Sequence, residues 1–376
     1  MRRIAIAPRD GWQSKVEQVG LVWHTGQQPY WDESAYYEFT AKEVDTLEAA
    51  TNELEKMSLA AVQHVIDNHL YARMGIPPVA VPLIEKSWEA EPPALYGRFD
   101  LAYDGANPPK LLEYNADTPT SLLEAAVVQW YWLQDVFPEH DQFNSLHERL
   151  VALWKELVPY IPGRHIDFCS MDDIEDGITV TYLQETARQA GLETSQFPVG
   201  EIGWDGSRFV GPDDGALHCV FKLYPWEWMV TEEFGKHLDG SGTMWIEPAW
   251  KMVLSNKGIL PILWKLFPRH PNLLESYFDS PALLMSWVKK PLLGREGSNI
   301  TLHEPGSDRQ TEGPYGQEGF IYQDYVKLQT FEGQHPVIGS WVIGHEEGNA
   351  AAGMGVREST DPITTNTSRF VPHLFR

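Results

Sequence analysis

The stretch GRFDLAYDGANPPKLLEYNADTPTS, residues 97–121, decides the fold of this 376-residue chain. Its pattern predicts two strands, from Arg98 to Asp104 and from Lys110 to Asn115, joined by a turn rich in Gly, Asn and Pro. Because side chains alternate between the two faces of a strand, a hairpin of these strands has one apolar and one polar face. The predicted apolar face holds Phe99, Leu101, Tyr103, Leu112 and Tyr114. The predicted polar face holds Arg98, Asp100, Asp104, Glu113 and Asn115.

The polar face has the composition of a site for Mg²⁺ bound to a polyphosphate. Mg²⁺ usually takes one or two carboxylates and completes its shell with phosphate oxygens, and a guanidinium suits phosphate geometry. A solvated face of an ordinary antiparallel sheet shows the same alternation. From the spacing alone, the solvated face is the more frequent case, so the rest of the chain has to decide.

Composition excludes several classes of protein. The net charge is −24, with 53 acidic against 29 basic residues, and no basic stripe of a nucleic-acid binder is visible. The acidity is compatible with a cationic substrate, although a soluble acidic surface explains it as well. The two cysteines, Cys169 and Cys219, lie in apolar runs and are expected to be reduced core thiols. We find no signal peptide or membrane span in the sequence and expect a cytoplasmic protein without a membrane or nucleic-acid partner; its oligomeric state is left open.

The chain outside the hairpin predicts an α/β (α+β) fold. Apolar periodicity from Thr40 to Gly75 predicts a long amphipathic helix with a break near Asn68, and a second helix is expected at 81–90. Further helices are expected after the hairpin and over 142–160. Strand, helix and strand then follow from His165 to Pro198 and predict a β-α-β unit.

Two helix starts near the predicted strand ends carry polar groups. Thr120 or Ser121 is expected to cap the helix after the hairpin, with Glu124 completing a capping box; a helix start can also bind an anion. Residues 171–176, MDDIED, follow a buried strand at the edge where open α/β sheets bind ligands. Carboxylates such as Glu175 and Asp176 could hold an ammonium there, or could simply favour the helix dipole.

The second half of the chain supplies cations and a glycine-rich loop. Lys257 lies between apolar runs, and a strand ending at Lys290 enters the loop GREGSN, residues 294–299. Glycines let backbone amides approach a ligand, and Arg295 adds charge, as expected of a loop over phosphates. A plain hairpin turn fits the loop equally well. Gln323 follows on a later strand, and Arg357 lies near the end of one of the last strands.

These blocks, taken in order, resemble the glutathionylspermidine synthetase-like family of ATP-grasp ligases. The resemblance is carried by YGRFD, KLLEYNAD, FKLYPWEW, EPAW followed by SNKGILPILW, VKKPLLGREGSNI and GVRES, and it covers nearly the whole chain. The chain looks most like the stand-alone, synthetase-only members, so no amidase domain is expected. The resemblance implies three parts: residues 1–162 with a helical region and the Mg/ATP hairpin, 163–240 as a substrate-binding α/β lobe that precedes the ATP-grasp core, and 241–376 as core and lid, with the lid near 280–325.

The resemblance also implies roles for individual residues. It places Mg²⁺ on Asp100, Glu113 and Asn115, and the transferring phosphate near Arg98. The ATP site would include Lys257, Lys290, Gly294, Gly297 and Gln323, with Arg295 closing from the lid. The acid substrate would face Arg357. The remaining substrate positions would be Thr118 and Thr120, where glutathione-binding relatives carry Ser, and Glu175 with Asp176, where relatives carry a Glu-Glu pair.

The implied activity is ATP-dependent amide bond formation. A peptide-like carboxylate would be activated as an acyl phosphate, which a polyamine-like amine would attack. Two alternatives remain open at this point: a non-catalytic ATP- or peptide-binding regulator that keeps the fold, and a phosphotransferase that stops after transfer of the phosphate.

Overall fold

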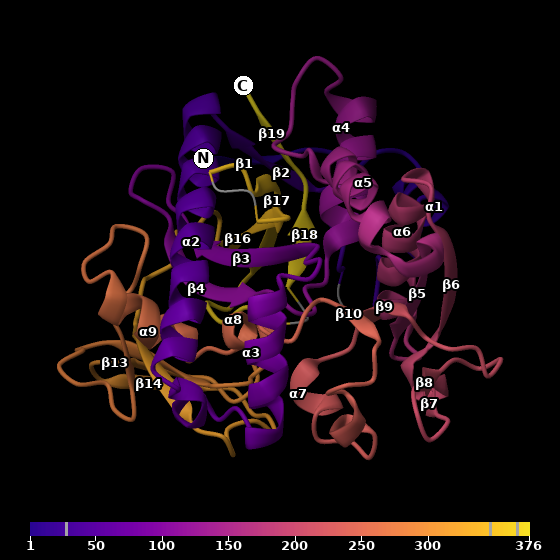
Figure 1. Ribbon diagram of the computed structural model, residues 1–376. Coiled ribbons are helices and arrows are strands. Elements are labelled where there is room, and N and C mark those ends of the chain that lie inside the picture. The colour runs from indigo at the N-terminus through magenta and orange to yellow at the C-terminus, as the bar shows by residue number, and fades with distance from the viewer. Residues whose placement is uncertain (27–28, 346–347, 366–367) are drawn as a thin grey trace.

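The computed structural model of the protein describes residues 1–26, 29–345, 348–365 and 368–376. At its centre lies an antiparallel five-stranded sheet in the order β18-β17-β16-β3-β4 (Figure 1). Its strands are β3 (Tyr96–Ala102), β4 (Lys110–Asn115), β16 (His335–Ile343), β17 (Ala351–Ser359) and β18 (Arg369–Val371). The predicted hairpin is therefore β3 and β4, and the C-terminal strands extend its sheet.

One face of the central sheet packs on the long helix α2 (Ala41–Asp67). The helix begins at a capping box, in which the Thr40 hydroxyl accepts from the Glu43 amide and the Glu43 carboxylate accepts from the Thr40 amide. The predicted break is present, because α2 ends at Asp67 and a separate helical turn begins at Leu70. Ile338 and Val342 of β16 belong to the core under this helix.

The opposite face of the central sheet packs on helices only over part of its length. Trp341 and Ile343 alternate with the residues that face α2, and they join the core beneath α4 (Gln129–Val136) and α5 (Leu146–Leu157). Arg98 and Asp100 lie on this same face, and the Arg98 guanidinium lies 5.6 Å from the Trp341 ring. The uncovered part of this face is where the candidate site forms.

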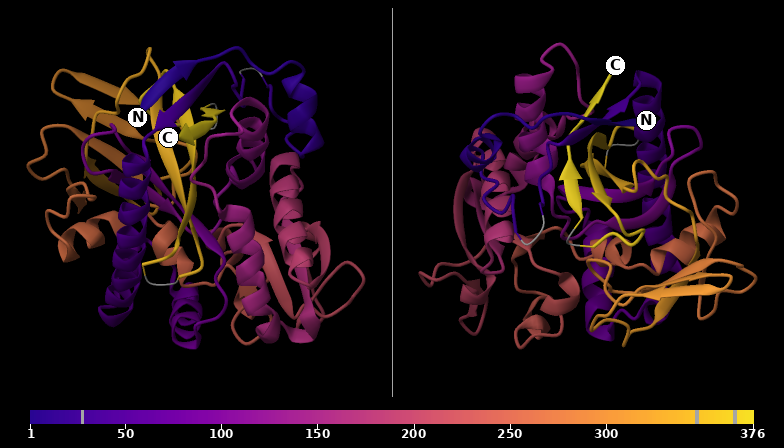
Figure 2. Two further views of the ribbon diagram at one scale, coloured as in Figure 1. Left: turned by 90° about the horizontal axis from the view of Figure 1, so that it is seen from above. Right: turned by 180° about the vertical axis from the view of Figure 1, so that it is seen from behind.

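A parallel sheet in the order β10-β9-β5-β6 lies to one side (Figures 1 and 2). It contains β5 (His165–Ser170), β6 (Glu193–Pro198), β9 (Cys219–Leu223) and β10 (Met244–Ile246). Helix α6 (Ile174–Gln189) connects β5 to β6, so the predicted β-α-β unit is confirmed. Cys169 and Cys219 are buried free thiols in this sheet, as expected, and burial raises the pKa of each to about 12.

A second antiparallel sheet, in the order β11-β15-β12-β13-β14, lies on the other side of the hairpin (Figure 2). Its strands are β11 (Ser276–Phe278), β12 (Trp287–Pro291), β13 (Thr301–Glu304), β14 (Ser307–Gln310) and β15 (Phe320–Asp324). They span much of the predicted lid. The chain termini meet in a small sheet of β1 (Arg2–Ala5), β2 (Ala35–Phe39) and β19 (His373–Phe375).

The remaining elements are short. They are α1 (Trp12–Gln18), α3 (Val81–Ala90), β7 (Gly203–Trp204), β8 (Phe209–Val210), α7 (Trp226–Met229), α8 (Lys251–Ser255) and α9 (Ile259–Leu266). None of the helices in the described parts of the chain has an apolar stretch of the length needed to cross a membrane.

Two details of the hairpin differ from the sequence prediction. Strand β3 ends at Ala102, and Asp104 instead accepts hydrogen bonds from the amides of Ala106 and Asn107 in the turn. A β-bulge lies in the pairing, because Asp100 opposes Glu113 whereas Leu101 opposes Leu111. The extra residue, Leu112, is thereby turned away from the apolar face and lines a cavity, which alternation alone does not reveal.

The predicted capping box after the hairpin is wrong. Ser121 has a φ of 68°, the Glu124 carboxylate accepts a hydrogen bond from the Tyr30 hydroxyl (2.6 Å), and no side-chain cap hydrogen bond forms at this helix start among the described residues. Residues 124–128 form a π-helical turn before α4. Glu124 is buried and needs a hydrogen-bond donor there, and the Tyr30 hydroxyl supplies one from a distant part of the chain, so tertiary contact overrides the local signal.

Candidate active site

Two adjoining cavities lie on the uncovered face of the hairpin. The smaller, of about 100 Å³, is mostly apolar and runs between the hairpin and the β12–β15 sheet. The larger, of about 550 Å³, is polar and runs toward the parallel sheet and the N-terminal segment. Asp100, Glu113, Gly297 and Thr364 line both. The two cavities therefore meet at the paired carboxylates of β3 and β4.

Asp100 is held between two arginines from different strands. Arg98 Nε donates to Asp100 Oδ1 at 2.8 Å, and Arg357 Nη2 of β17 donates to Asp100 Oδ2 at 2.6 Å. Arg98 also donates from Nη1 to the backbone oxygen of Thr120 (2.6 Å). Room for the Arg98 side chain depends on Gly339 of β16, because a Cβ there would lie 2.9 Å from Arg98 Cδ. Arg98 and Asp100 are buried and ion-paired, so this part of the polar face is not a solvated surface.

Glu113 faces Asp100 across the strand pair and has its own cation. Lys257 Nζ lies 3.0 Å from Glu113 Oε2 and also donates to the Gly294 backbone oxygen at 2.6 Å. Asn115 Nδ2 donates to Glu113 Oε1 (3.1 Å). Burial alone would raise the pKa of Glu113, but the charges of Lys257 and Lys290 outweigh it and hold this pKa well below its usual range. The carboxylate is therefore ionised at neutral pH.

The donor set at this junction fits Mg²⁺ bound to a polyphosphate. The described residues hold no group of three His, Cys, Asp or Glu side chains arranged as a metal site. The hairpin offers two carboxylates, Asp100 and Glu113, and one amide, Asn115, at the wall of the polar cavity. Mg²⁺ characteristically takes one or two carboxylates and leaves its other positions to water and phosphate oxygens, so two facing carboxylates are a sufficient protein contribution.

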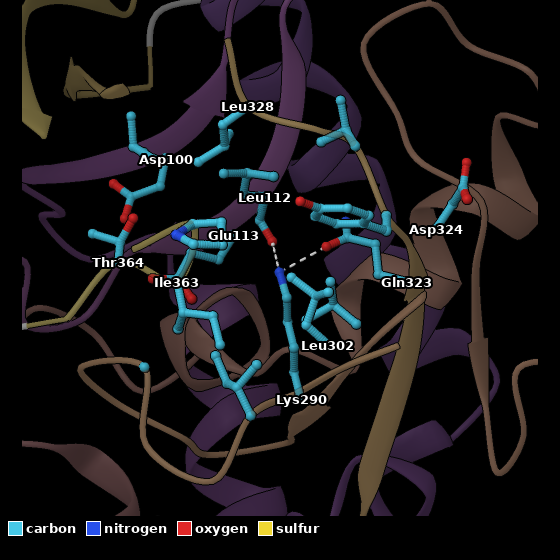
Figure 3. A pocket seen from close by; sticks show the side chains of 17 residues that line it. Asp100, Leu112, Glu113, Lys290, Leu302, Gln323, Asp324, Leu328, Ile363 and Thr364 are labelled. Carbon is cyan, nitrogen blue, oxygen red and sulfur yellow. Dashed lines mark hydrogen bonds between the residues drawn. The ribbon is translucent and has the colours of Figure 1, made fainter. Parts of the chain in front are cut away.

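Lys290 and Gln323 form the polar end of the apolar cavity (Figure 3). Lys290 Nζ donates to the Leu112 backbone oxygen at 2.8 Å and to Gln323 Oε1 at 2.7 Å. Gln323 Nε2 donates to the Leu111 backbone oxygen (3.0 Å), so both side chains connect the β12–β15 sheet to the hairpin. Burial lowers the pKa of Lys290 to about 8, although Glu113 acts in the opposite direction.

The glycine-rich loop reaches over the polar cavity. Arg295 Nη1 donates to Thr118 Oγ1 at 2.8 Å, and Arg295 Nη2 donates to Glu227 Oε1 at 2.6 Å. Gly297 has a φ of 67°, and a Cβ there would lie 2.5 Å from the Thr364 backbone oxygen. The position therefore requires glycine for both its conformation and its close approach to the C-terminal segment.

The far end of the polar cavity is acidic. Asp173 caps helix α6 by accepting from the amides of Glu175 and Asp176. Burial, together with the charge of Glu124, raises the pKa of Glu175 to about 8. Burial, with the neighbouring Asp173, raises the pKa of Asp176 to about 6. Such carboxylates gain from a cation placed between them, because a positive charge relieves both the burial and the mutual repulsion.

The structure brings most of the predicted site residues together. The predicted residues that line one or both cavities are Arg98, Asp100, Glu113, Asn115, Thr118, Thr120, Glu175, Lys290, Arg295, Gly297, Gln323 and Arg357. Three others do not line them: Lys257 lies behind Glu113, Gly294 accepts from Lys257, and Asp176 lies beside Glu175. Their individual roles stay predictions.

Sequence reasoning missed the walls that complete the cavities. The apolar wall comes from Leu112, Val288, Ile300, Leu302, Val326, Leu328, Val337 and Ile363. The polar cavity is also lined by Trp23 and Tyr30 and by Thr364, Thr365 and Ser368. Alternating apolar residues look like ordinary core positions in a sequence, and the N- and C-terminal segments carry no chemical motif, so no signal was available for either wall.

Comparison with known proteins relates this geometry to a family. Residues 3–376 match a family model described as "Glutathionylspermidine synthase preATP-grasp". A Haemophilus influenzae protein described as a "Putative acid--amine ligase" is 43% identical over 364 residues, which cover 92% of this chain and 91% of that protein. The bifunctional glutathionylspermidine synthetase/amidase of Escherichia coli is 30% identical over 368 residues, covering 88% of this chain and 58% of that protein.

More distant matches are also described as synthetases or as synthetase-like proteins. Trypanothione synthetase of Crithidia fasciculata is 27% identical over 344 residues, covering 83% of this chain and 52% of that protein. Among solved structures, a glutathione synthetase-like effector from Globodera pallida superposes with a TM-score of 0.61 at 10% identity, covering 97% of this chain and 95% of that one; at that identity the likeness concerns the fold alone. The resemblance and the α/β ATP-grasp-type fold predicted from the sequence are thus confirmed, and the chain belongs to the glutathionylspermidine synthase family of ATP-dependent carbon–nitrogen ligases.

Proposed function

We propose that the protein uses ATP and Mg²⁺ to join a peptide-like carboxylate to a polyamine-like amine. One observation carries the proposal: the facing carboxylates Asp100 and Glu113 lie where an apolar cavity meets a polar one. A nucleotide has an apolar base at one end and charged phosphates at the other. The apolar cavity suits the base, and the carboxylates where it meets the polar cavity suit Mg²⁺ bound to the phosphates.

The apolar cavity is the proposed site of the adenine base. Aliphatic side chains on both walls suit the faces of a purine, and a few placed polar groups fix its orientation. Gln323 and Lys290 supply these groups at one end. Lys290 also lies near enough to Glu113 to influence its charge, and is therefore placed between the proposed base and phosphate positions.

The junction is the proposed site of the phosphates. Asp100, Glu113 and Asn115 would hold Mg²⁺, which when bound neutralises phosphate charge and lowers the cost of transferring it. Arg98, Arg295 and Arg357 line the same cavity. Phosphoryl transfer depends mainly on positioning and charge neutralisation, and three fixed guanidinium groups from β3, the glycine-rich loop and β17 provide both.

The polar cavity beyond the junction is the proposed site of both substrates. The acid would lie against Thr118, Thr120 and Arg357, where its carboxylate oxygen attacks the γ-phosphorus of ATP and ADP leaves. The nitrogen of the amine then attacks the resulting acyl phosphate, and inorganic phosphate leaves as the amide bond forms. Glu175, with Asp176 beside it, would hold a second, charged nitrogen of the amine, because both carboxyls are destabilised as ions until a cation is present.

The test is ADP release by the purified protein with Mg-ATP across a grid of peptides, including glutathione, and amines, including spermidine. The proposal expects release that requires one acid and one amine together, with one amide formed for each ADP. Release with an acid alone would instead favour a phosphotransferase. Nucleotide binding without turnover across the whole grid would favour a non-catalytic regulator.

A further inference from the structure

Glu227 lies outside both cavities but contacts a residue that lines one of them. Its side chain belongs to the short helix α7 and is 11% exposed, and its Oε1 accepts the 2.6 Å hydrogen bond from Arg295 Nη2. Glu227 is part of the FKLYPWEW block, residues 221–228, to which the proposed function assigns no role. The block therefore contributes a carboxylate to the glycine-rich loop, which is about seventy residues away in the sequence.

Helix α7 is fixed by a buried network that leaves Glu227 little freedom. Lys222 Nζ donates to Asp117 Oδ1 (2.7 Å) and to the Tyr224 backbone oxygen (2.9 Å). Asp117 Oδ2 accepts from the Trp226 amide (2.9 Å), and Trp226 Nε1 donates to the Glu247 backbone oxygen (2.9 Å). Lys222 and Asp117 are fully buried. A carboxylate mounted on such a network is a rigid acceptor, because moving it would break several buried polar contacts.

Arg295 keeps hydrogen-bonding capacity after these contacts. A guanidinium has five N–H donors in a planar fork. Thr118 takes one donor from Nη1 and Glu227 takes one from Nη2, whereas Nε is buried and has no hydrogen-bond partner among the residues that the structure describes. Burial alone would lower the pKa of Arg295, but Glu227 outweighs it and the pKa is raised. The guanidinium is therefore charged, held in place, and still able to donate to an anion in the polar cavity.

We propose that Glu227 is a positioning residue that holds Arg295 and thereby keeps the glycine-rich loop closed over the polar cavity. Arg295 then joins three segments: the loop 294–299, the end of the hairpin at Thr118, and helix α7. An anionic ligand meets a guanidinium that is already oriented, so less of its binding free energy is spent on ordering the loop. That the anion is the phosphate of ATP rests on the proposed function; the contact of Glu227 with the loop does not.

The test compares the wild-type protein with Glu227→Gln, which keeps the shape of the side chain and removes its charge. Hydrogen exchange of the amides of residues 294–300 is measured first without ligand, and then the Kd of a non-hydrolysable ATP analogue is measured with Mg²⁺. Loss of a charge-assisted hydrogen bond should speed exchange in the loop and weaken analogue binding, each by about tenfold. In steady-state assays the KM for ATP should rise more than kcat falls, because saturating nucleotide can still close the loop.

Glu233→Gln is the matched control, because it neutralises an exposed carboxylate a few residues after α7 and should change neither measurement. Glu227→Asp keeps the negative charge on a side chain that is shorter by one methylene group. Its loop exchange and its Kd for the analogue should lie between those of the wild type and those of Glu227→Gln. If Glu227→Gln does not fold, the ranking of Glu227→Asp against the wild type in both measurements decides instead.

Each contrary outcome has a distinct meaning. Unchanged loop exchange and unchanged analogue binding in Glu227→Gln would overturn the inference. Tighter binding would also overturn it, because Glu227 would then compete with the ligand for Arg295. If the wild-type protein binds no nucleotide, the proposed function fails, and the loop exchange alone still decides whether Glu227 holds Arg295.

Discussion

Two glutamate–lysine pairs in this protein have the same chemistry and different surroundings. Glu247 and Lys251 lie 2.5 Å apart with neither side chain exposed, whereas Glu113 and Lys257 lie 3.0 Å apart with side-chain exposures of 27% and 9%. Glu247 also accepts from the amides of Leu95 and Tyr96, and Lys251 donates to the Tyr96 backbone oxygen. The first pair is enclosed by protein groups at the start of β3, and the second opens onto the cavities.

The difference separates a structural pair from a binding pair. Both side chains are fully buried, so a ligand cannot reach either Glu247 or Lys251, and removing one partner leaves a buried charge. Glu113 lines both cavities, so a ligand cation can be added to its surroundings without breaking the fold. A glutamate–lysine pair can therefore be structural or can belong to a binding site. The two cases are distinguished by whether the pair opens onto a cavity, and not by the strength of the ion pair.

The largest effect is expected from breaking the enclosed pair. Lys251→Met leaves the Glu247 carboxylate buried without its cation, and the free energy of unfolding should fall by about 3–5 kcal/mol. Urea unfolding followed by tryptophan fluorescence measures the change. Lys265→Met on the exposed side of α9 is the matched control and should cost less than about 0.5 kcal/mol. A loss below about 1 kcal/mol in Lys251→Met would show that the enclosed pair is not structural.

The opposite pattern is expected for the open pair. Glu113→Ala removes a proposed Mg²⁺ ligand from a cavity wall, so Mg-dependent ADP release should fall at least about a hundredfold, while unfolding changes by less than in Lys251→Met. ADP release and urea unfolding are measured on the same preparation. Asp45→Ala, on the exposed side of α2, should alter neither. Wild-type turnover in Glu113→Ala would remove the hairpin from the proposed metal site.

A third comparison concerns Glu175, which forms no ion pair with a Lys, Arg or His side chain among the described residues. Because the pKa of Glu175 in the folded protein is raised to about 8, the folded state binds more protons than the unfolded state between about pH 4.5 and 8. Stability from this group is therefore full at low pH and is lost as pH rises through 8. Glu175→Gln removes that loss, so it should match the wild type at pH 4 and exceed its free energy of unfolding at pH 9. The rise of this pKa from 4.5 to about 8 corresponds to roughly 5 kcal/mol in full; because Glu175 borders a cavity in which water screens its charge, the expected gain is roughly 2 kcal/mol.

Thermal or urea unfolding at several pH values measures the Glu175 effect, with Glu185→Gln on the exposed side of α6 as control. A saturating amine substrate should reduce the difference at pH 9, since a bound cation relieves the same charge. A difference between Glu175→Gln and the wild type that does not depend on pH would contradict the raised pKa.

The charged residues of the site could be predicted from the sequence better than the residues that form the cavity walls. Arg98, Asp100 and Glu113 could be placed together because strand alternation is local and charged groups on one face are conspicuous. Leu112 could not, because a bulge of one residue leaves no mark in the sequence. Tyr30 depends on a longer-range event: Phe370 donates its amide to the Tyr30 backbone oxygen, which joins segments 340 residues apart. Such a pairing is set by the whole fold and not by any local pattern.

Gln323 gives the smallest expected effect and the sharpest test of the open site. It is a neutral group, 2% exposed, that accepts from Lys290 and donates to the Leu111 backbone oxygen, and so it combines a structural contact with a position on the cavity wall. Gln323→Leu keeps the volume and removes both hydrogen bonds. The expected cost is about 1 kcal/mol in unfolding and a roughly fivefold weaker Kd for an ATP analogue. Calorimetric titration measures the Kd of the ATP analogue, and urea unfolding measures the change in stability, so the binding effect and the structural effect are obtained separately. If Gln323 is structural only, unfolding changes and the Kd does not; if it orients Lys290 at the nucleotide, the Kd weakens even under conditions in which both proteins are fully folded.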